Sequence, residues 1–283
     1  MMMRGPRYPR IVRLAFMATL FVGSLWLLVL WLQPRMAFFP YRGVQRTPAA
    51  FDLPYTDLKI ETPDGVTLHG WWMEHPEPRA QVVYWHGNGG NLALWLVVLA
   101  DIRQRGFSVL AVDYRGYGDS GGSPSEQGIY LDAAATNAYY REHLQRADVP
   151  TIYWGRSLGA AVASRVAAAD HPDALILESP FPNVRFLFRY NPVMLPLSFL
   201  STYRFPTATH LESYSGPLLV THGDADSIIP FAAGQRVFDR APTSQKSFVT
   251  LKGADHNDMH AGHPDYWPAV ERFIESLRGS LSR

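Results

Sequence analysis

The sequence Thr151-Ile-Tyr-Trp-Gly-Arg-Ser-Leu-Gly-Ala-Ala-Val-Ala decides the fold of this chain. Its short apolar run, Ile152 to Trp154, predicts a buried strand, and the small apolar residues from Ala160 to Ala169 predict a helix. So sharp a turn between a strand and a helix forces the residue at its centre, Ser157, into strained backbone angles. The strain exposes the serine hydroxyl beside the positive N-terminus of the helix.

The residues on either side of this serine form the pattern Gly-x-Ser-x-Gly, with Gly155 and Gly159 as its glycines. Small residues are needed at both positions because the strand and the helix nearly touch there. The five-residue pattern alone is weak, and its place between a strand and a helix makes it much more specific. The sequence therefore predicts a nucleophilic serine at position 157.

A second match to the pattern, Gly118-Asp-Ser-Gly-Gly122, has Ser120 at its centre. It is similar to the serine segment of chymotrypsin-type proteases, which need an all-β chain with His and Asp before the Ser. No apolar strand directly precedes Ser120 and no helix begins at it. We expect this serine to be a turn residue in a loop under the active site.

Strand and helix signals alternate along the rest of the chain. A β-hairpin is expected around the turn Pro63-Asp-Gly65. Further strands are predicted at 82–86, 108–113, 174–178, 218–222 and 247–251, and helices at 92–105, 125–146, 231–240 and 267–277. Such alternation gives right-handed βαβ units. The expected fold class is α/β, with a mostly parallel central sheet of about eight strands flanked by helices.

The composition excludes several classes of site. The chain has 283 residues, a formal net charge of +1 and no cysteine. A near-neutral charge without a basic stripe argues against nucleic acid as a partner. The absence of cysteine excludes disulfides, thiolate metal sites and a cysteine nucleophile, but it does not decide the compartment.

An uncharged, almost wholly apolar run at 14–32 follows a basic N-terminal arm, residues 1–13. As a helix it would span about 28 Å, close to the ~30 Å hydrocarbon core of a bilayer. A signal peptide is the alternative, but its apolar region is usually about 7–15 residues long and no Ala-x-Ala-like cleavage site follows. We expect a single-pass transmembrane helix, an irregular linker over 33–54 and a folded domain over 55–283.

Arginines flank the apolar run on both sides. They are Arg4, Arg7, Arg10 and Arg13 before it, and Arg35, Arg42 and Arg46 after it. The N-terminal arm also carries the free amine and lies closer to the run. The positive-inside rule therefore favours a cytoplasmic N-terminus and a domain on the non-cytoplasmic side of the membrane.

The segment 181–214 interrupts the alternation of strands and helices, and it is rich in aromatic residues and proline. Two interpretations stay open: it is a lid over the active site, or its aromatic side chains fill the core of the domain. Its apolar face could also contact the bilayer.

A serine hydroxyl is a weak nucleophile at neutral pH, so it needs a base that is oriented by an acid. Candidates follow two of the predicted strands, in Asp224-Ala-Asp226 and in Asp255-His256. Both segments lie at the carboxyl ends of strands, the edge of an open α/β sheet where ligands bind. We expect His256 to be the base and Asp226 the acid.

Further motifs occur in a characteristic order. They are His86-Gly-Asn-Gly-Gly-Asn91, Asp113-Tyr-Arg-Gly-Tyr-Gly-Asp-Ser-Gly-Gly122, Glu178-Ser-Pro-Phe181, His222-Gly-Asp-Ala-Asp226 and Gly253-x-x-His256-Asn-Asp258, with Gln33-Pro-Arg-x-x-x-Phe-Pro40 just after the apolar run. With them, nearly the whole chain resembles a serine hydrolase of the α/β-hydrolase superfamily. The resemblance is strongest to the small membrane-anchored branch of bud-emergence-like proteins and relatives that remove palmitoyl groups.

This resemblance implies the chain order nucleophile, acid, histidine. The family's acid lies four residues after the strand-ending His222, which favours Asp226 over Asp224. Glu178 ends the strand where some lipases carry the acid, and it is a weaker candidate. Its alternative role is to hold neighbouring backbone or Ser179.

The resemblance also implies an oxyanion hole in the loop after His86. Its donors would be the backbone N–H groups of Asn88, or its neighbour, and of Leu158, each contributing about 3 kcal/mol. No cofactor is implied. The spacing of His256, His260 and His263 suggests a metal site, but no carboxylate or thiolate pattern completes it, so we expect no metal.

The expected function is hydrolysis of a carboxylic ester or thioester, from a small acyl or lipid-like substrate, through an acyl-enzyme. Two alternatives stay open: a peptidase or amidase that uses the same triad, and a non-catalytic binding protein of the same fold. The sequence does not decide the acyl length, the head group or the oligomeric state.

Overall fold

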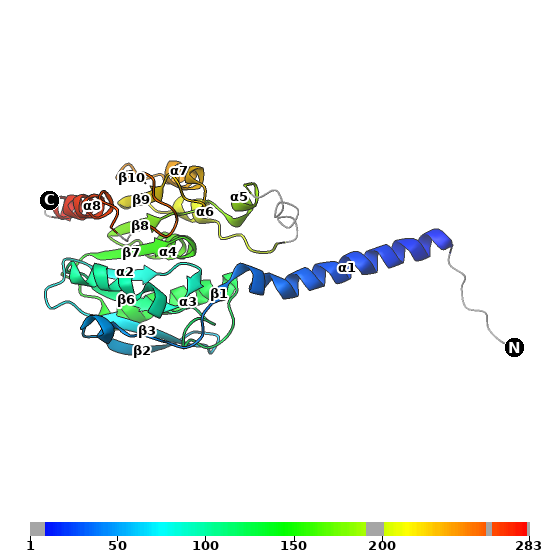
Figure 1. Cartoon of the computed structure of the whole chain (residues 1–283), viewed down its shortest axis with the longest axis horizontal. Coiled ribbons are helices and arrows are strands. Elements are labelled where there is room, and N and C mark those ends of the chain that lie inside the picture. The colour runs from blue at the N-terminus through cyan, green and yellow to red at the C-terminus, as the bar shows by residue number, and fades with distance from the viewer. Residues whose placement is uncertain (1–8, 191–200, 259–261, 282–283) are drawn as a thin grey trace.

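The computed structural model describes residues 9–190, 201–258 and 262–281 (Figure 1). An eight-stranded sheet runs through the folded domain in the order β10-β9-β8-β7-β4-β6-β3-β2. Its strands are β2 (Thr56–Glu61), β3 (Thr67–Met73), β4 (Gln81–Trp85), β6 (Ser108–Val112), β7 (Thr151–Arg156), β8 (Ala174–Glu178), β9 (Leu218–Gly223) and β10 (Lys246–Leu251). Strand β3 is antiparallel to both its neighbours, β2 and β6, and all other pairs are parallel. The predicted α/β fold is therefore confirmed.

Two hydrophobic cores lie on opposite faces of this sheet. One contains side chains of α2 (Leu92–Gln104) and α8 (Tyr266–Leu281), and the other those of α3 (Glu126–Tyr139), α4 (Leu158–Asp170) and α7 (Phe231–Arg240). Strand β7 serves both cores, because successive side chains of a strand point to opposite faces. Tyr153 packs in the α3/α4/α7 core, whereas Ile152 and Trp154 pack in the α2/α8 core.

The predicted segment 181–214 contains two short helices, α5 (Val184–Phe188) and α6 (Thr207–Leu211). Phe181, Phe205 and Tyr214 are buried in the core on the α4 side of the sheet. These aromatic residues therefore fill the domain, which was one of the two interpretations of the segment. Residues 191–200 lie outside the described residues, and the lid remains a prediction.

The apolar run at 14–32 lies within a longer helix, α1 (Arg10–Ala37), which projects away from the domain (Figure 1). Large apolar side chains along α1, such as Phe16, Phe21 and Trp31, are exposed. The helix is long and apolar enough to cross a membrane. An exposed apolar helix of this length is costly in water, whereas in lipid its backbone hydrogen bonds are satisfied within the helix.

The last five residues of α1 and the six that follow it, 33–43, are called the exit segment below. The sequence predicts an irregular linker here, but residues 33–37 continue the helix and the segment makes specific contacts with the domain. Gln33 donates to Thr202 Oγ1 at 2.8 Å and accepts from the Thr202 backbone N–H at 3.0 Å. Phe38 is buried, with its ring 5.2 Å from that of Tyr203. The difference arises because partners distant in the sequence order this segment.

Strand β1 (Phe39–Pro40) lies within the exit segment and pairs in parallel with β5 (Gly89–Gly90). Further along, the predicted linker contains a 3₁₀ turn at Pro48–Phe51. The helix predicted at 125–146 is shorter than expected, since α3 ends at Tyr139 and a π-helical turn follows at Tyr140–Leu144.

Candidate active site

Ser157 lies at the junction between β7 and α4, with φ 55° and ψ −115°. A positive φ is uncommon for any residue other than glycine and costs about 1–3 kcal/mol. The surrounding structure imposes it, since the Ser157 N–H donates to the Glu178 carbonyl at 2.8 Å while α4 begins at the next residue. The chain therefore turns sharply at Ser157, between the end of β7 and the start of α4.

The two flanking glycines lie where no side chain fits. A Cβ on Gly155 would lie 2.1 Å from the Gly159 carbonyl oxygen, and a Cβ on Gly159 would lie 1.9 Å from the carbonyl oxygen of Trp85. Both obstacles are backbone atoms of buried elements, which cannot move aside cheaply. The close approach of β7, α4 and β4 therefore requires glycine at both positions.

We predict that Gly159→Ala lowers the free energy of unfolding by about 3 kcal/mol or more, because the new methyl group overlaps the β4 backbone. Gly121→Ala is the matched control, since its Cβ would meet no atom closer than 3.5 Å. Thermal unfolding of both variants measures the difference. Equal unfolding midpoints would contradict the close approach of the strand and the helix.

The Asp226 carboxylate accepts hydrogen bonds on both oxygens. Its Oδ1 accepts from the backbone N–H groups of Ile228 at 3.0 Å and Ile229 at 2.7 Å. Its Oδ2 lies 2.8 Å from His256 Nδ1 and accepts from the Ser179 hydroxyl at 2.7 Å. The structure thus brings the predicted acid and base into direct contact and fixes the orientation of the acid.

The protonation state of this pair follows from its surroundings. Burial raises the pKa of Asp226, but hydrogen bonds from His222 and His256 outweigh it and hold the pKa well below its ordinary value. His222 Nε2 lies 3.4 Å from the same carboxylate oxygen. An ionised Asp226 keeps the proton of His256 on Nδ1, which leaves Nε2 free to accept a proton from a nucleophile.

The loop that carries His256 is held by two further side chains. Asp255 accepts from the backbone N–H groups of Ser227 and His256, each at 2.7 Å. The buried side chain of Arg156 donates to the His256 carbonyl oxygen, and its guanidinium lies 5.3 Å from the centre of the Trp95 ring. Because Arg156 precedes Ser157 in the chain, it links the serine turn to the histidine loop.

Ser157 and His256 come from elements that Arg156 connects, but the described part of the chain shows no hydrogen bond between the serine hydroxyl and the imidazole. In ligand-free enzymes such hydrogen bonds are often long and tighten only when the substrate binds. The geometry therefore joins the acid to the base directly, and the nucleophile to the base through Arg156.

The predicted oxyanion donors also lie at this edge of the sheet. Leu158 is the first residue of α4, so its N–H has no partner within the helix. Among the described residues, neither this N–H nor that of Asn88 has a hydrogen-bond partner. Both donors are consequently available to a developing negative charge.

The side chain of Asn88 is fixed from two directions. Its Nδ2 donates to the Ala37 carbonyl at 2.7 Å, and its Oδ1 accepts from the Tyr117 hydroxyl at 2.9 Å. The next two residues, 89–90, pair with β1, and the Tyr41 N–H donates to the Gly90 carbonyl at 2.9 Å. The exit segment of α1 therefore packs along the loop that carries Asn88.

The competing serine has a different environment. Ser120 is buried, donates to the Asp113 carbonyl at 2.7 Å and accepts from the His69 N–H at 2.9 Å. Its hydroxyl is thus occupied by backbone groups, as suits a structural residue in a loop.

The two other candidates for the catalytic acid accept hydrogen bonds from groups other than His256. Asp224 accepts from the Gly253 N–H at 2.5 Å, which joins the two loops beyond β9 and β10. Glu178 accepts from the Trp154 indole N–H at 2.7 Å and from the Tyr266 hydroxyl. The carboxylate that contacts the His256 ring is that of Asp226, at 2.8 Å.

Four side chains around the site were not assigned these roles from the sequence: Arg156, Ser179, His222 and Asp255. Ser179 and His222 lie inside the quoted motifs at the active edge of the sheet: Ser179 directly follows β8, and His222 is the last residue but one of β9. That position was the available signal. Arg156 gave no such signal, because the variable position of Gly-x-Ser does not indicate a partner.

No group of three or more possible metal ligands occurs among the described residues, and His260 lies outside them.

Comparisons with known proteins agree with this architecture. Residues 76–213 match the family described as serine aminopeptidase, S33. Protein bem46 of Schizosaccharomyces pombe is 30% identical over 244 residues, covering 81% of this chain and 79% of that protein. An uncharacterised membrane protein of Saccharomyces cerevisiae is 30% identical over 235 residues, covering 81% of this chain and 82% of that protein.

Lysophosphatidylserine lipase ABHD12 of Mus musculus is 33% identical over 268 residues, covering 78% of this chain and 66% of that protein. Among solved structures, the esterase Pf2001 of Pyrococcus furiosus has a similar fold, with a TM-score of 0.70 and 22% identity. The alignment covers 85% of this chain and 97% of that chain.

The chain therefore belongs to the α/β-hydrolase superfamily of serine hydrolases. Its relatives place it in the branch that contains bem46 and ABHD12, as the sequence motifs indicated, and they identify it as an enzyme of the esterase and lipase kind.

Proposed function

We propose that this enzyme hydrolyses a carboxylic ester or thioester with Ser157 as nucleophile, His256 as base and Asp226 as the acid that orients it. His256 Nε2 takes the hydroxyl proton as Ser157 Oγ bonds to the carbonyl carbon. The proton then passes to the leaving alcohol or thiol as its bond to the carbonyl carbon breaks, which leaves an acyl-enzyme. Water activated by His256 adds to the acyl carbon and releases the acid and the free serine.

The observation that carries this proposal is the contact between an ionised Asp226 and His256 at the same sheet edge as a strained serine. The charge on Asp226 stabilises the imidazolium that forms when His256 takes a proton. The N–H groups of Asn88 and Leu158 would stabilise the oxyanion, and removing such a donor from an enzyme typically lowers kcat by about 10²–10³-fold.

The substrate class we propose is a lipid-like acyl ester from the membrane, with α1 as the single-pass anchor. Ala37, at the end of α1, hydrogen-bonds to Asn88, so the anchor meets the domain beside the proposed oxyanion hole. ABHD12, a relative of this chain, carries the name lysophosphatidylserine lipase, which favours a substrate of the same general kind. The arginines of the N-terminal arm favour a catalytic domain on the non-cytoplasmic side.

The name of the matching family, serine aminopeptidase, supports the peptidase or amidase alternative. A panel of matched esters, thioesters and amides with the same acyl group separates the two. We expect hydrolysis of the esters or thioesters at least about a hundredfold faster than of the amides. Faster hydrolysis of amides would replace the proposed reaction with peptide or amide cleavage.

We predict that deleting residues 1–32 gives a folded, water-soluble enzyme that retains its kcat on short soluble esters. The folded domain has its own two cores, and Gln33 and Phe38 keep their contacts in this variant. On esters embedded in vesicles, the rate should fall about tenfold or more, because the anchor no longer raises the local concentration.

Deleting residues 1–43 is the informative comparison. It also removes the carbonyl of Ala37 and strand β1, which support the loop of Asn88. We expect a loss of kcat on the short soluble esters as well, of about tenfold or more. Equal activity of the two truncated proteins would show that the exit segment does not support catalysis.

The N-terminus of the protein isolated from its host distinguishes an anchor from a signal peptide. A mature chain that starts near Gln33 would identify the apolar run as a signal peptide.

A further inference from the structure

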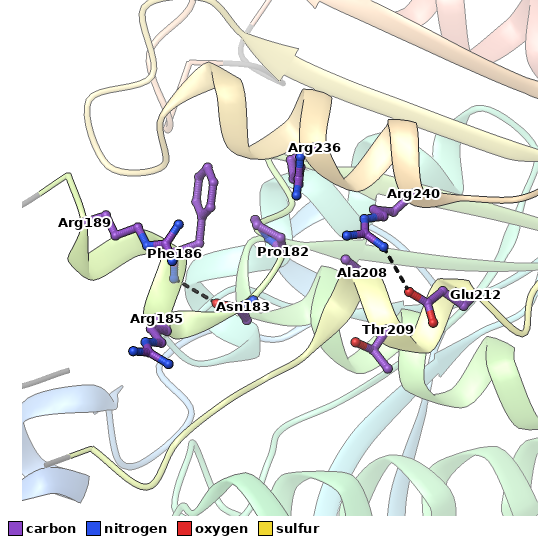
Figure 2. A pocket seen from close by; sticks show the side chains of 10 residues that line it. All are labelled: Pro182, Asn183, Arg185, Phe186, Arg189, Ala208, Thr209, Glu212, Arg236 and Arg240. Atoms are coloured by element: carbon purple, nitrogen blue, oxygen red, sulfur yellow. Dashed lines mark hydrogen bonds and ion pairs between the residues drawn. The ribbon is translucent and has the colours of Figure 1, made fainter. Parts of the chain in front are cut away.

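An open cavity of about 380 Å³ lies between α5, α6 and α7, and neither Ser157 nor His256 is among its lining residues (Figure 2). Four arginines line it: Arg185, Arg189, Arg236 and Arg240. Among the described residues that line it, Glu212 is the acidic one. This cavity is called the arginine pocket below.

The arginine pocket carries an excess of positive charge. Arg240 lies 3.6 Å from Glu212, and both side chains are about half exposed, so this ion pair is weak. Within the described residues, Arg189 and Arg236 form no ion pair. Positive charges that line one cavity favour an anion there.

The arrangement suits a phosphate group in particular. Figure 2 shows Arg240 of α7 reaching Glu212 at the end of α6, with Arg236 on the same face of α7 and Arg189 at the end of α5. A guanidinium presents its N–H donors in a planar fork that matches two phosphate oxygens. The pocket also contains the ring of Phe186, an apolar surface beside the charges.

A short series of contacts connects this pocket to the end of the membrane helix. Gln33 directly follows the apolar run of α1 and hydrogen-bonds to Thr202. Two residues beyond Thr202, the Arg204 carbonyl accepts from the N–H of Val184, the first residue of α5. Figure 1 shows α5 on the side of the domain from which α1 projects. If α1 spans the bilayer, the pocket lies near the head groups of the lipids.

We propose that the arginine pocket binds the phosphate group of an anionic phospholipid in the leaflet next to the domain. This inference rests on the proposed membrane position of α1 and does not require the proposed hydrolysis. The bound lipid is a second attachment to the bilayer besides α1. Two attachments fix the rotation of the domain about the helix axis, so that the edge with Ser157 and Asn88 faces the membrane.

The test uses the full chain with Ser157→Ala, so that no probe is consumed, in micelles of a neutral detergent. Thermal unfolding is followed while dioleoylphosphatidylglycerol is added, and a ligand of the folded state raises Tm as its concentration exceeds Kd. We expect a saturable rise in Tm with this anionic lipid and a much smaller one with dioleoylphosphatidylcholine.

In the same background, Arg189→Gln with Arg236→Gln should weaken the apparent affinity for phosphatidylglycerol about tenfold. The matched control is Arg146→Gln with Arg272→Gln, which removes the same charge from surfaces that do not line the pocket and should leave the affinity unchanged. All four side chains are exposed or partly exposed, so both double variants are expected to fold.

Three results would overturn the proposal. They are an unchanged affinity in the Arg189→Gln, Arg236→Gln protein, an equal loss in the control protein, and a response to phosphatidylcholine as large as that to phosphatidylglycerol. Inorganic phosphate that raises Tm as strongly as the lipid at equal concentration would assign the pocket to a free anion instead. If the Ser157→Ala protein binds phosphatidylglycerol and the wild-type protein hydrolyses none of the panel of esters and thioesters, the pocket is supported and the proposed reaction is refuted.

Discussion

Ser157→Ala is expected to abolish labelling by a fluorophosphonate and to lower kcat for ester hydrolysis by about 10⁵–10⁶-fold. The serine hydroxyl lies at a strained turn, next to the first N–H of α4 and on the element that Arg156 ties to His256. Alanine removes the hydroxyl oxygen that, in the proposed mechanism, bonds to the acyl carbon. Protein mass spectrometry of the labelled chain, together with ester kinetics, measures both effects.

Ser120→Ala is the matched control, because Ser120 lies in the same Gly-x-Ser-x-Gly pattern. Its hydroxyl bonds to the Asp113 carbonyl and the His69 N–H, so alanine should cost about 1–3 kcal/mol of stability. Labelling and kcat of the folded protein should stay near those of the wild type. Labelling that persists in Ser157→Ala, or that disappears from a folded Ser120→Ala protein, would contradict the assignment.

The sheet and the order of strands and helices along the chain could be predicted from local sequence. Each central strand is a short apolar run, and each helix that covers the sheet is either amphipathic or rich in small residues. The hairpin around Pro63-Asp-Gly65 and strands β4 and β6 to β10 fall close to their predicted ranges, whereas the two-residue strand β5 was not predicted. Local sequence sets these elements, since burial on both faces makes the central strands continuously apolar. The contact between Asp226 and His256 could be predicted as well, because parallel strands bring their carboxyl ends to one edge.

The exit segment could not be predicted, because its order depends on partners far away in the sequence. Gln33 bonds to Thr202, and β1 pairs with residues 89–90 only after the rest of the sheet has formed. Prolines and scattered aromatic residues in this segment suggest a loop when their partners are unknown. The role of Arg156 could not be predicted for the same reason, because its acceptor is the backbone carbonyl of a residue 100 positions further along the chain.

The second large effect is expected from Asp226→Asn, which should lower kcat by about 10⁴-fold. The asparagine keeps the shape of the side chain but removes the charge that stabilises the His256 imidazolium. The asparagine amide can also donate to His256 Nδ1, which favours the tautomer with the proton on Nε2. In that tautomer Nε2 cannot accept the serine proton, so His256 cannot act as the base. Hydrolysis of a short soluble ester, measured from pH 5 to 9, gives the rate and its pH dependence.

Asp224→Asn separates the two acids of the same loop. Asp224 accepts from the Gly253 N–H, and the amide oxygen of asparagine can accept the same hydrogen bond, so less than about a tenfold loss of kcat is expected. In the wild type, hydrogen bonds from His222 and His256 hold the pKa of Asp226 well below its ordinary value, so this carboxylate stays ionised as the pH falls towards 5. The acid limb of the profile should therefore show a single protonation, that of the base. A greater loss in Asp224→Asn than in Asp226→Asn, with both proteins folded, would transfer the role of the acid to Asp224.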